Sequence, residues 1–408
     1  QAYMKDVTMH EVGHTLGLRH NFRASHAVSD RLVNDPEYTR THAFTGSVME
    51  YSAINLPRPG EPGGTPFQTT LGPYDFWAIE YAYKSLSADE EKAELARIAA
   101  RSAEPGLAFG TDEDNFLGID PDALQFDLGD DPLAFAARRF DIAADLFKRQ
   151  ETRAFKPGQD YAGLRRSLAY AVRDAARAAG VLLRQVGGVR TLRDLPGSGR
   201  DPMQPVPAAP QRSALAMLSS RLLGADAFAV SPALLRRLAP DFLERGDSFG
   251  MASATEYLPS NDLLELQRAL LNRLMGDALA VRLLDAVQQV DDPAQALRPA
   301  ELYAQLEADV WSELGLHAAR PAVTPIAMPR RALQREHVNR LAFLVLRPTL
   351  MSRPDARALL RQQAGTLATR LEQAARQRGL DETVRLHLKD CADTLRTALS
   401  ARMERLGA

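Results

Sequence analysis

The segment HEVGHTLGLRH, from His10 to His20, holds the residues whose types and spacing are best suited to chemistry. On a helix, His10 and His14 are four residues apart, so both imidazoles project from one face about one turn apart. This spacing suits two ligands of a single metal ion. Gly17 permits the positive φ angle with which a chain can leave a helix and turn back, and His20 follows three residues later.

Three neutral imidazoles with an open fourth position are typical of a catalytic zinc site, because structural zinc sites usually fill that position with a protein ligand. We therefore predict that His10, His14 and His20 bind Zn²⁺. Glu11 stands beside the first ligand and is suited to take a proton from a zinc-bound water, whose pKa the metal lowers to about 7, and to return it to the leaving amine. The competing interpretation is a chance cluster of helix histidines.

This segment resembles the extended zinc signature of the metzincin metallopeptidases, in which a methionine-containing turn lies beneath the metal. GSVMEY, from Gly46 to Tyr51, resembles that turn. The resemblance implies that Met49 packs under the imidazoles and that Tyr51 approaches the zinc ion or the oxyanion. Together with RHNF and GPYDFWAIEYAY, the motifs are most similar to bacterial zinc-dependent metallopeptidases with an EcxA-like zinc-binding domain, over roughly residues 1–85.

The resemblance implies a zinc-dependent endopeptidase that acts on peptide or protein substrates outside the cytoplasm, in the periplasm, on the outer surface or after secretion. The better-known branches of the family carry other residues at the position of Asn21. In metzincins an upstream sheet subdomain forms the upper wall of the cleft, and the residues before His10 are too few to form it. We therefore expect the chain to be a C-terminal fragment whose active site an upstream part of the same polypeptide completes.

Two alternatives to an endopeptidase remain open. The first is a zinc-stabilised, non-catalytic module that binds a partner through its helices, because residues 111–408 carry no recognisable catalytic motif. The second is a zinc hydrolase of a non-peptide amide. Screening a broad peptide library for cleavage separates both from the endopeptidase.

Composition narrows the remaining function classes. The net charge of −2 gives no electrostatic reason to expect a nucleic acid partner. The longest apolar runs are shorter than the roughly 18 residues that a transmembrane helix needs. The single cysteine, Cys391, excludes an internal disulfide framework and a cysteine-based zinc ribbon.

We expect a mainly α fold, in which the lower helical half of a metzincin catalytic domain, with a long loop, precedes an all-α accessory region. The predicted zinc-binding subdomain covers residues 1–110 and the accessory region residues 111–408, with a possible further boundary in the proline-rich stretch 195–210. Apolar periodicity predicts a helix over residues 5–17 that carries the first two ligands. Residues 21–70 are rich in Pro, Gly, Asn, Ser and Thr, which predicts the loop.

The remaining helices follow from periodicity and end signals. One begins near Pro73, and another follows Ser87, which with Glu90 suggests a capping box. The other predicted helices cover residues 132–149, 162–185, 211–223, 232–238, 262–275, 299–314, 331–346, 355–377 and 382–405, the last two as a hairpin. Residues 188–195 form the one strand-like run noted in this part of the chain.

Several other polar residues could have a function, and for each the structural interpretation is favoured. His26 and His42, with Asp30 and Asp35, could bind a second ion or contact substrate, but solvated polar residues of a loop are the more common case. The cluster Asp112, Asp114, Asp120 and Asp122 suggests calcium but lacks the spacing of a known calcium loop, which favours a turn with helix caps. Glu50 could be a fourth zinc ligand or a residue at the cleft rim. Packing or surface roles are expected for His317, His337, His387, Trp77, Trp311 and Cys391.

Overall fold

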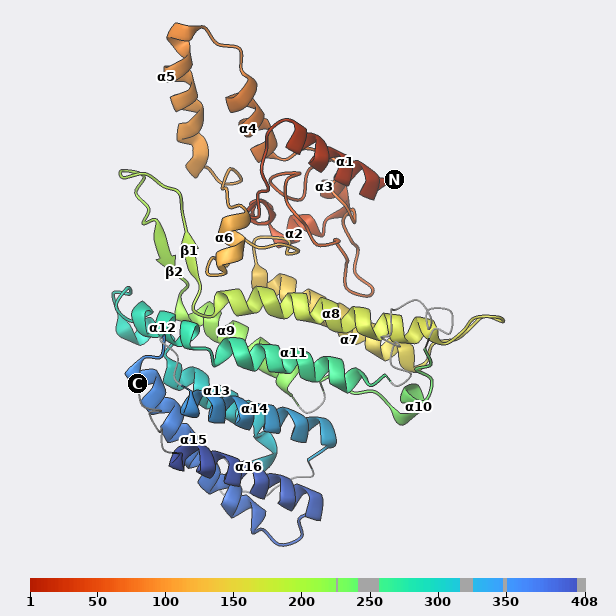
Figure 1. The fold of residues 1–408 in the computed structure, drawn as a ribbon. Coiled ribbons are helices and arrows are strands. Elements are labelled where there is room, and N and C mark those ends of the chain that lie inside the picture. The colour runs from red at the N-terminus through yellow and green to blue at the C-terminus, as the bar shows by residue number, and fades with distance from the viewer. Residues whose placement is uncertain (225–226, 241–256, 316–325, 348–350, 402–408) are drawn as a thin grey trace, which may run out of the picture. The chain divides into compact units, whose positions relative to one another are not determined.

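The computed structural model describes residues 1–224, 227–240, 257–315, 326–347 and 351–401 of the chain (Figure 1). The fold is mainly α, as expected. Within this described part, the sheet consists of two antiparallel strands, β1 (Val189–Thr191) and β2 (Met203–Pro205), with Arg190 opposite Gln204. No helix in the same ranges has both the length and the apolar character that a membrane span requires.

The chain divides into two compact units. The first contains residues 1–152 and 170–206, and the second contains residues 153–169 and 207–408. The first unit therefore extends beyond residue 110, where the sequence predicts the end of the zinc-binding subdomain, and closes inside the proline-rich stretch 195–210. A compact unit is not the same thing as a catalytic subdomain, so the predicted boundary at residue 110 stays a prediction.

Several helices of the first unit begin at a side-chain cap or an early proline. In α7 the side chain of Asp131 accepts hydrogen bonds from the backbone of Leu133 and Ala134, and Pro132 occupies the first turn. The helices are α1 (Ala2–Thr15), α2 (Asp30–Val33), α3 (Pro36–Thr41), α4 (Pro73–Tyr83), α5 (Ala88–Ala99), α6 (Asp112–Leu117), α7 (Pro132–Glu151) and the later part of α8 (Ala162–Gln185), with 3-10 turns at Ala24–Ala27 and Ala100–Ala103.

Residues 21–70, predicted as a loop, contain the short helices α2 and α3. Asp35 caps α3 by accepting hydrogen bonds from the backbone N–H groups of Glu37 and Tyr38, and Pro36 follows it. Such short helices bury too few residues for a periodic pattern to show in the sequence. The predicted capping box at Ser87 does not form, because the Ser87 hydroxyl donates to the Glu90 carboxylate instead of accepting from the backbone.

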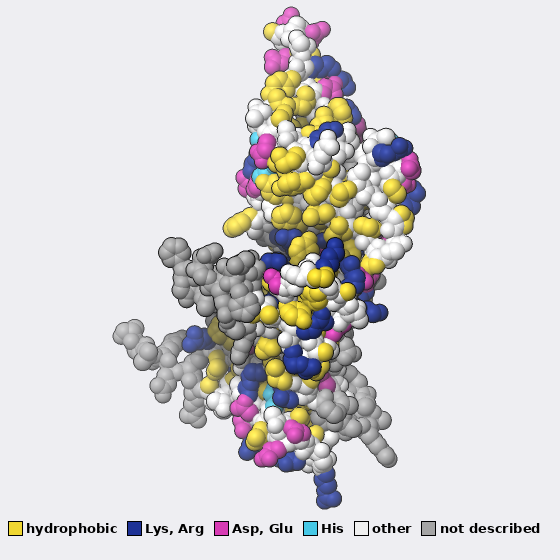
Figure 2. Space-filling view, turned by 90° about the vertical axis from the view of Figure 1, so that its right-hand side faces the viewer, with side chains coloured by type: hydrophobic (Ala, Val, Ile, Leu, Met, Phe, Trp, Pro, Cys, Tyr) yellow, Lys and Arg dark blue, Asp and Glu magenta, His cyan; other side chains and the backbone are white. Residues whose placement is uncertain are grey.

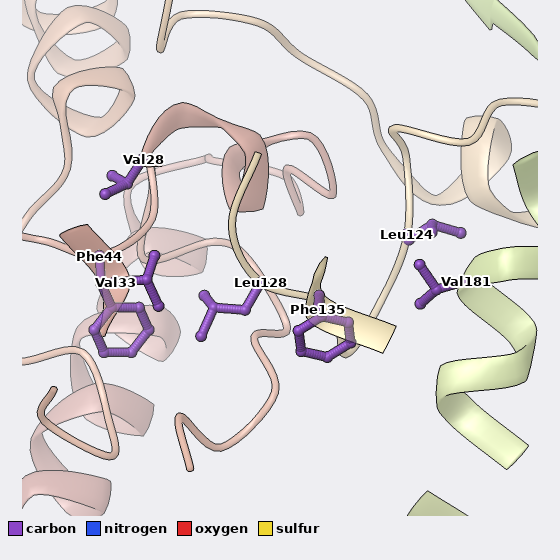
Figure 3. Close-up of a cluster of buried hydrophobic side chains, with 7 residues drawn as sticks. All are labelled: Val28, Val33, Phe44, Leu124, Leu128, Phe135 and Val181. Carbon is purple, nitrogen blue, oxygen red and sulfur yellow. The ribbon is translucent and has the colours of Figure 1, made fainter. Parts of the chain in front are cut away.

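A cluster of buried aliphatic and aromatic side chains joins this region to the later helices of the first unit (Figure 3). Val33 and Phe44 come from the early segment, Phe135 from α7 and Val181 from α8. Burying such side chains stabilises the fold by roughly 1.5–3 kcal/mol each. The cluster therefore fixes the position of the segment between the third histidine and the methionine turn, although that segment has little regular structure.

The second unit is helical in its described residues. Its elements are α9 (Ala208–Leu218), which ends in a π-helical turn at Ser219–Leu223, α10 (Pro232–Leu235), α11 (Pro259–Leu274), α12 (Asp277–Ala286), α13 (Pro299–Val310), α14 (Met328–Leu346), α15 (Pro354–Ala375) and α16 (Glu382–Ser400), with 3-10 turns at Pro293–Gln295 and Ser312–Leu314. The predicted hairpin is confirmed: α15 and α16 pack side by side (Figure 1), and Asp381 caps α16 by accepting from the Val384 N–H group.

One helix of the second unit is missing from the prediction, and two predictions fall outside the described residues. Helix α12 is absent from the predicted set, because α11 ends at Leu274 and the new helix begins only three residues later. The predicted end of the last helix falls on residues 402–405, and His317 also lies outside the described residues. Trp311, His337 and Cys391 are fully buried in this unit, which agrees with their predicted packing roles.

Candidate functional site

Helix α1 presents the first two histidines of the candidate metal site. The rings of His10 and His14 lie 4.8 Å apart between centroids, at 86° to each other. The helix ends at Thr15, two residues earlier than predicted, and Gly17 then adopts a φ angle of +84°. This left-handed conformation, which favours glycine, turns the chain back so that the backbone N–H of Leu18 reaches the carbonyl of Gly13.

His20 joins the two helix histidines after this turn. Its ring centroid lies 5.3 Å from that of His10 and 4.9 Å from that of His14. One nitrogen from each of the three rings lies within 4.8 Å of the other two, and within the described ranges this is the one group of ligand side chains so arranged. The three residues predicted from spacing are therefore brought together.

Each imidazole is held through Nδ1. His10 Nδ1 donates to the carbonyl of Val48 at 2.8 Å, and His14 Nδ1 donates to the carbonyl of Leu18 at 3.0 Å. His20 Nδ1 lies 2.9 Å from a carboxylate oxygen of Asp112. A proton on Nδ1 leaves the lone pair of a neutral ring on Nε2, which is the form that binds a metal.

The free nitrogens fit a divalent transition metal. Nε2 of His10 and Nε2 of His20 are buried and have no hydrogen-bond partner in the described part of the chain. An unpaired buried nitrogen costs free energy unless something binds it. Burial is the largest influence on the pKa of His10 and lowers it, which favours the neutral ring. Three imidazoles whose Nδ1 atoms are held by hydrogen bonds are a set of ligands that suits zinc.

Met49 packs against α1, the helix that carries His10 and His14. Its side chain is fully buried, and a Cβ atom built on Gly13 would lie only 2.3 Å from its sulfur. Any side chain at Gly13 would therefore collide with the thioether. No role was predicted for Gly13. The sequence did contain a signal for such a role: a glycine inside a helix lowers helix stability, so its presence between His10 and His14 indicates that a close contact requires it.

The methionine turn is held by a buried carboxylate at the start of α4. Asp75 accepts hydrogen bonds from the Ser47 hydroxyl at 2.6 Å, the Val48 N–H at 3.0 Å and the Gly72 N–H at 2.8 Å. On the other side, the backbone N–H of Asn21 donates to the carbonyl of Met49 at 3.0 Å. Val48 also holds His10, so the turn positions a ligand as well as the methionine.

Tyr51 extends from this turn towards the histidines. Its ring centroid lies 5.1 Å from that of His10 and 4.5 Å from that of His20. Burial, and then the negative charges of Glu11 and Asp112, raise the pKa of Tyr51, so the phenol keeps its proton at neutral pH. Glu11 is exposed on α1 and lines the same pocket as Tyr51.

Asp112 is a site residue that sequence reasoning did not assign to the site. It begins α6, where Thr111 and Asp114 form the capping box, and it lies 92 positions after His20 in sequence. The acidic cluster was visible in the sequence, but its proximity to His20 was not. The other members have partners of their own: Asp114 pairs with Arg193, Asp120 with Arg23 and Asp122 with Arg190.

Glu50 is buried, and it lines the pocket beside the histidines. Its carboxylate accepts hydrogen bonds from the backbone N–H groups of Ser25 and Tyr51. Burial, and then the charge of Asp127, raise the pKa of Glu50 well above its usual value. Asp127 also lies 3.4 Å from His26, whereas His42 contacts Tyr38, so the structure gives these two histidines separate surroundings.

A pocket of about 400 Å³ opens beside the histidines, entirely within the first unit. Its walls come from α1, the segment after the methionine turn, α7 and α8, and they include His10, Glu11 and Tyr51. Hydrophobic side chains gather on the face of this unit seen in Figure 2. On α1 the exposed large hydrophobic residues are Tyr3, Met4, Val12 and Leu16.

Comparison with known proteins gives one match. A family model described as Met-zincin matches residues 1–317, which is more than half of the chain and includes every residue of the site. No curated protein and no solved structure matches the sequence.

Proposed function

This chain belongs to the Met-zincin family, and on that premise we propose that it is a zinc-dependent endopeptidase. The observation that supports the proposal is that all three imidazoles make hydrogen bonds through Nδ1. Their Nε2 atoms therefore remain free to bind one ion, and the three side chains are close enough to do so. When bound there by His10, His14 and His20, zinc supplies Lewis acidity for the scissile carbonyl and lowers the pKa of its water to about 7.

Glu11 is proposed to handle the proton. Its carboxylate stands next to His10 in sequence and lines the pocket in which a peptide would meet the metal. A carboxylate in this position accepts the proton that the attacking water releases and then delivers it to the leaving amine. Its exposure keeps it in contact with solvent, from which the water enters.

Tyr51 is proposed to assist at the developing oxyanion. The raised pKa of its phenol keeps the hydroxyl protonated, so it can act as a hydrogen-bond donor. A donor that is already positioned stabilises negative charge more effectively than water, which must reorient during the reaction. Met49 and Asp75 take part only by holding the turn from which Tyr51 and the carbonyl of Val48 project.

The test measures metal content and turnover in the same preparations. We expect about one zinc per chain after purification without a chelator. With a broad peptide library as substrate, Glu11→Gln should keep the zinc and lower kcat roughly 10²- to 10⁴-fold. Glu91→Gln, at an exposed position on α5, serves as the matched control and should change neither quantity.

The outcomes separate the competing functions. Zinc without cleavage of any peptide would contradict the endopeptidase and favour the non-catalytic module. Zinc with cleavage of non-peptide amides alone would favour the other hydrolase. A folded chain that contains no zinc would contradict all three.

A further inference from the structure

Besides Glu11, the pocket beside the histidines contains one further acid that no neighbour neutralises. Asp6 lies on α1 one turn before His10, about 6 Å along the helix axis, and it lines the pocket. Among the residues that the structure describes, none donates a hydrogen bond to its carboxylate or pairs with it. Burial raises the pKa of Asp6 to about 6.

Apart from Glu11 and Arg177, the other charged groups of the pocket already have partners. Arg139 and Asp174 are both buried, and three hydrogen bonds of 3.2, 2.9 and 2.5 Å join them. Arg139 also donates to the carbonyl of Ile54 at 3.0 Å. Glu50 accepts two backbone N–H groups, and its raised pKa favours the neutral acid. These groups cancel or neutralise one another, so they offer no charge to a ligand.

Arg177 is the remaining cation of the lining. It is exposed on α8, and its guanidinium lies over the ring of Phe126, 5.1 Å from the centroid. Asp6 stands on α1, so the two charges come from different walls of the pocket. A ligand cation beside Asp6 therefore does not have to displace Arg177.

An aromatic ring stands on the same stretch of α1 as Asp6, and a second ring packs against it. Tyr3, three residues earlier, packs against Phe67 with ring centroids 5.2 Å apart, and both line the pocket. Residues three apart on a helix share a face. Aromatic faces attract ammonium and guanidinium groups and also pack against the methylene stem of a long side chain.

We propose that this pocket binds a lysine or arginine side chain of the peptide substrate, next to the bond that is cleaved, and that Asp6 is the residue that selects it. The inference rests on the proposed endopeptidase function. The stem of the substrate side chain lies along Tyr3 and Phe67, and its cationic end pairs with the Asp6 carboxylate. This ion pair compensates the carboxylate for the water that it loses on burial. The distance of one helical turn between Asp6 and His10 suits a side chain with a four-carbon stem.

Cleavage specificity tests the proposal. With a peptide series that differs only in one residue beside the cleaved bond, the wild type should prefer Lys or Arg over Gln roughly 10- to 100-fold. Asp6→Asn should remove most of that ratio, and Asp6→Lys should shift it towards Glu and Asp. Asp393→Asn, at an exposed position on α16, is the matched control and should keep the wild-type ratio. A preference for apolar residues that Asp6→Asn leaves unchanged would overturn the proposal.

A binding measurement separates this inference from the proposed function. Benzamidine, an aromatic cation, should bind the chain in a calorimetric titration, and Asp6→Asn should weaken the binding at least tenfold, while benzoate should not bind at this position. This arm needs no turnover, so a chain that cleaves nothing but binds benzamidine through Asp6 contradicts only the endopeptidase. Equal benzamidine affinity of the wild type and Asp6→Asn would contradict the role of Asp6 itself.

Discussion

At the scale of single residues, the three histidines differ in what holds them. Backbone carbonyls hold His10 and His14, whereas a carboxylate holds His20. A charged acceptor makes an imidazole more basic and fixes its tautomer more strongly than a carbonyl does. The spacing of the ligands could be read from the sequence, because helix geometry dictates it. Asp112 could not be identified, because only the folded chain brings it to His20.

Asp112 should contribute to zinc affinity. Asp112→Ala is expected to weaken zinc binding roughly 10- to 100-fold, since supporting residues of metal ligands typically have effects of this size. Asp112→Asn should weaken zinc binding less than Asp112→Ala, because the amide oxygen of asparagine can still accept a hydrogen bond from His20 Nδ1. Competition with a chromophoric chelator measures both, with Glu113→Gln on the same helix as the control. If Asp112→Ala binds zinc as tightly as the wild type, the supporting role is wrong.

Gly13 should be intolerant of a side chain because of Met49. Gly13→Ala would bring a Cβ atom to 2.3 Å from the sulfur, and such overpacking typically destabilises a core by about 1–3 kcal/mol. The matched control is Gly180→Ala in α8, where a Cβ atom meets nothing within 4 Å and should stabilise the helix by up to about 1 kcal/mol. Urea unfolding with a chelator present compares the two, and equal effects would refute the close contact.

Asp6 should make stability depend on pH. Its folded pKa of about 6 lies above the usual value of 3.8, so the folded chain holds a proton there that the unfolded chain releases. The carboxyl therefore costs no stability below about pH 3.8, and stability is lost as the pH rises from there to about 6. The stability advantage of Asp6→Asn should grow over this interval and stay constant above it, in urea midpoints measured from pH 4 to 7.5. An advantage that is independent of pH would contradict the burial of this acid.

At the scale of elements, long periodic helices were predictable and irregular connections were not. The predicted range 162–185 coincides with α8, and Pro132 marks the start of α7 in both the prediction and the structure. Helices of this length show their buried face as a repeating pattern. Helices α2, α3 and α6 are too short for such a pattern, and tertiary contacts such as that between Asp112 and His20 hold α6 against the site. The methionine turn has no periodicity at all and was identified by resemblance alone.

At the scale of the whole molecule, the site belongs to one compact unit. All three histidines, Met49 and Asp112 lie in the first unit, and the second unit has its own buried core. The sequence indicated a helical chain with a zinc site near one end. It could not show that residues 170–206 pack with the region that carries the three histidines, because that assignment depends on contacts between distant segments.

Removal of zinc should therefore destabilise the first unit alone. A ligand at a thousand times its Kd stabilises the state that binds it by about 4 kcal/mol. The chain has two tryptophans, and Trp77 lies in the first unit while Trp311 lies in the second. Thermal unfolding followed by fluorescence in Trp311→Phe and Trp77→Phe variants reports on each unit separately. A chelator should lower the midpoint temperature only of the transition that Trp77 reports. A lower midpoint in both transitions would contradict the prediction that the metal stabilises the first unit alone.

X-ray absorption at the zinc edge of the zinc-loaded chain tests the central claim most directly, because it reads the ligands of the ion itself. The proposed site predicts three imidazole nitrogens at about 2.0–2.1 Å with a solvent oxygen in the remaining position. His20→Ala should reduce the imidazole contribution to two rings. Coordination by fewer than three imidazoles in the wild type, or a fourth ligand from the protein in place of solvent, would contradict a catalytic zinc site.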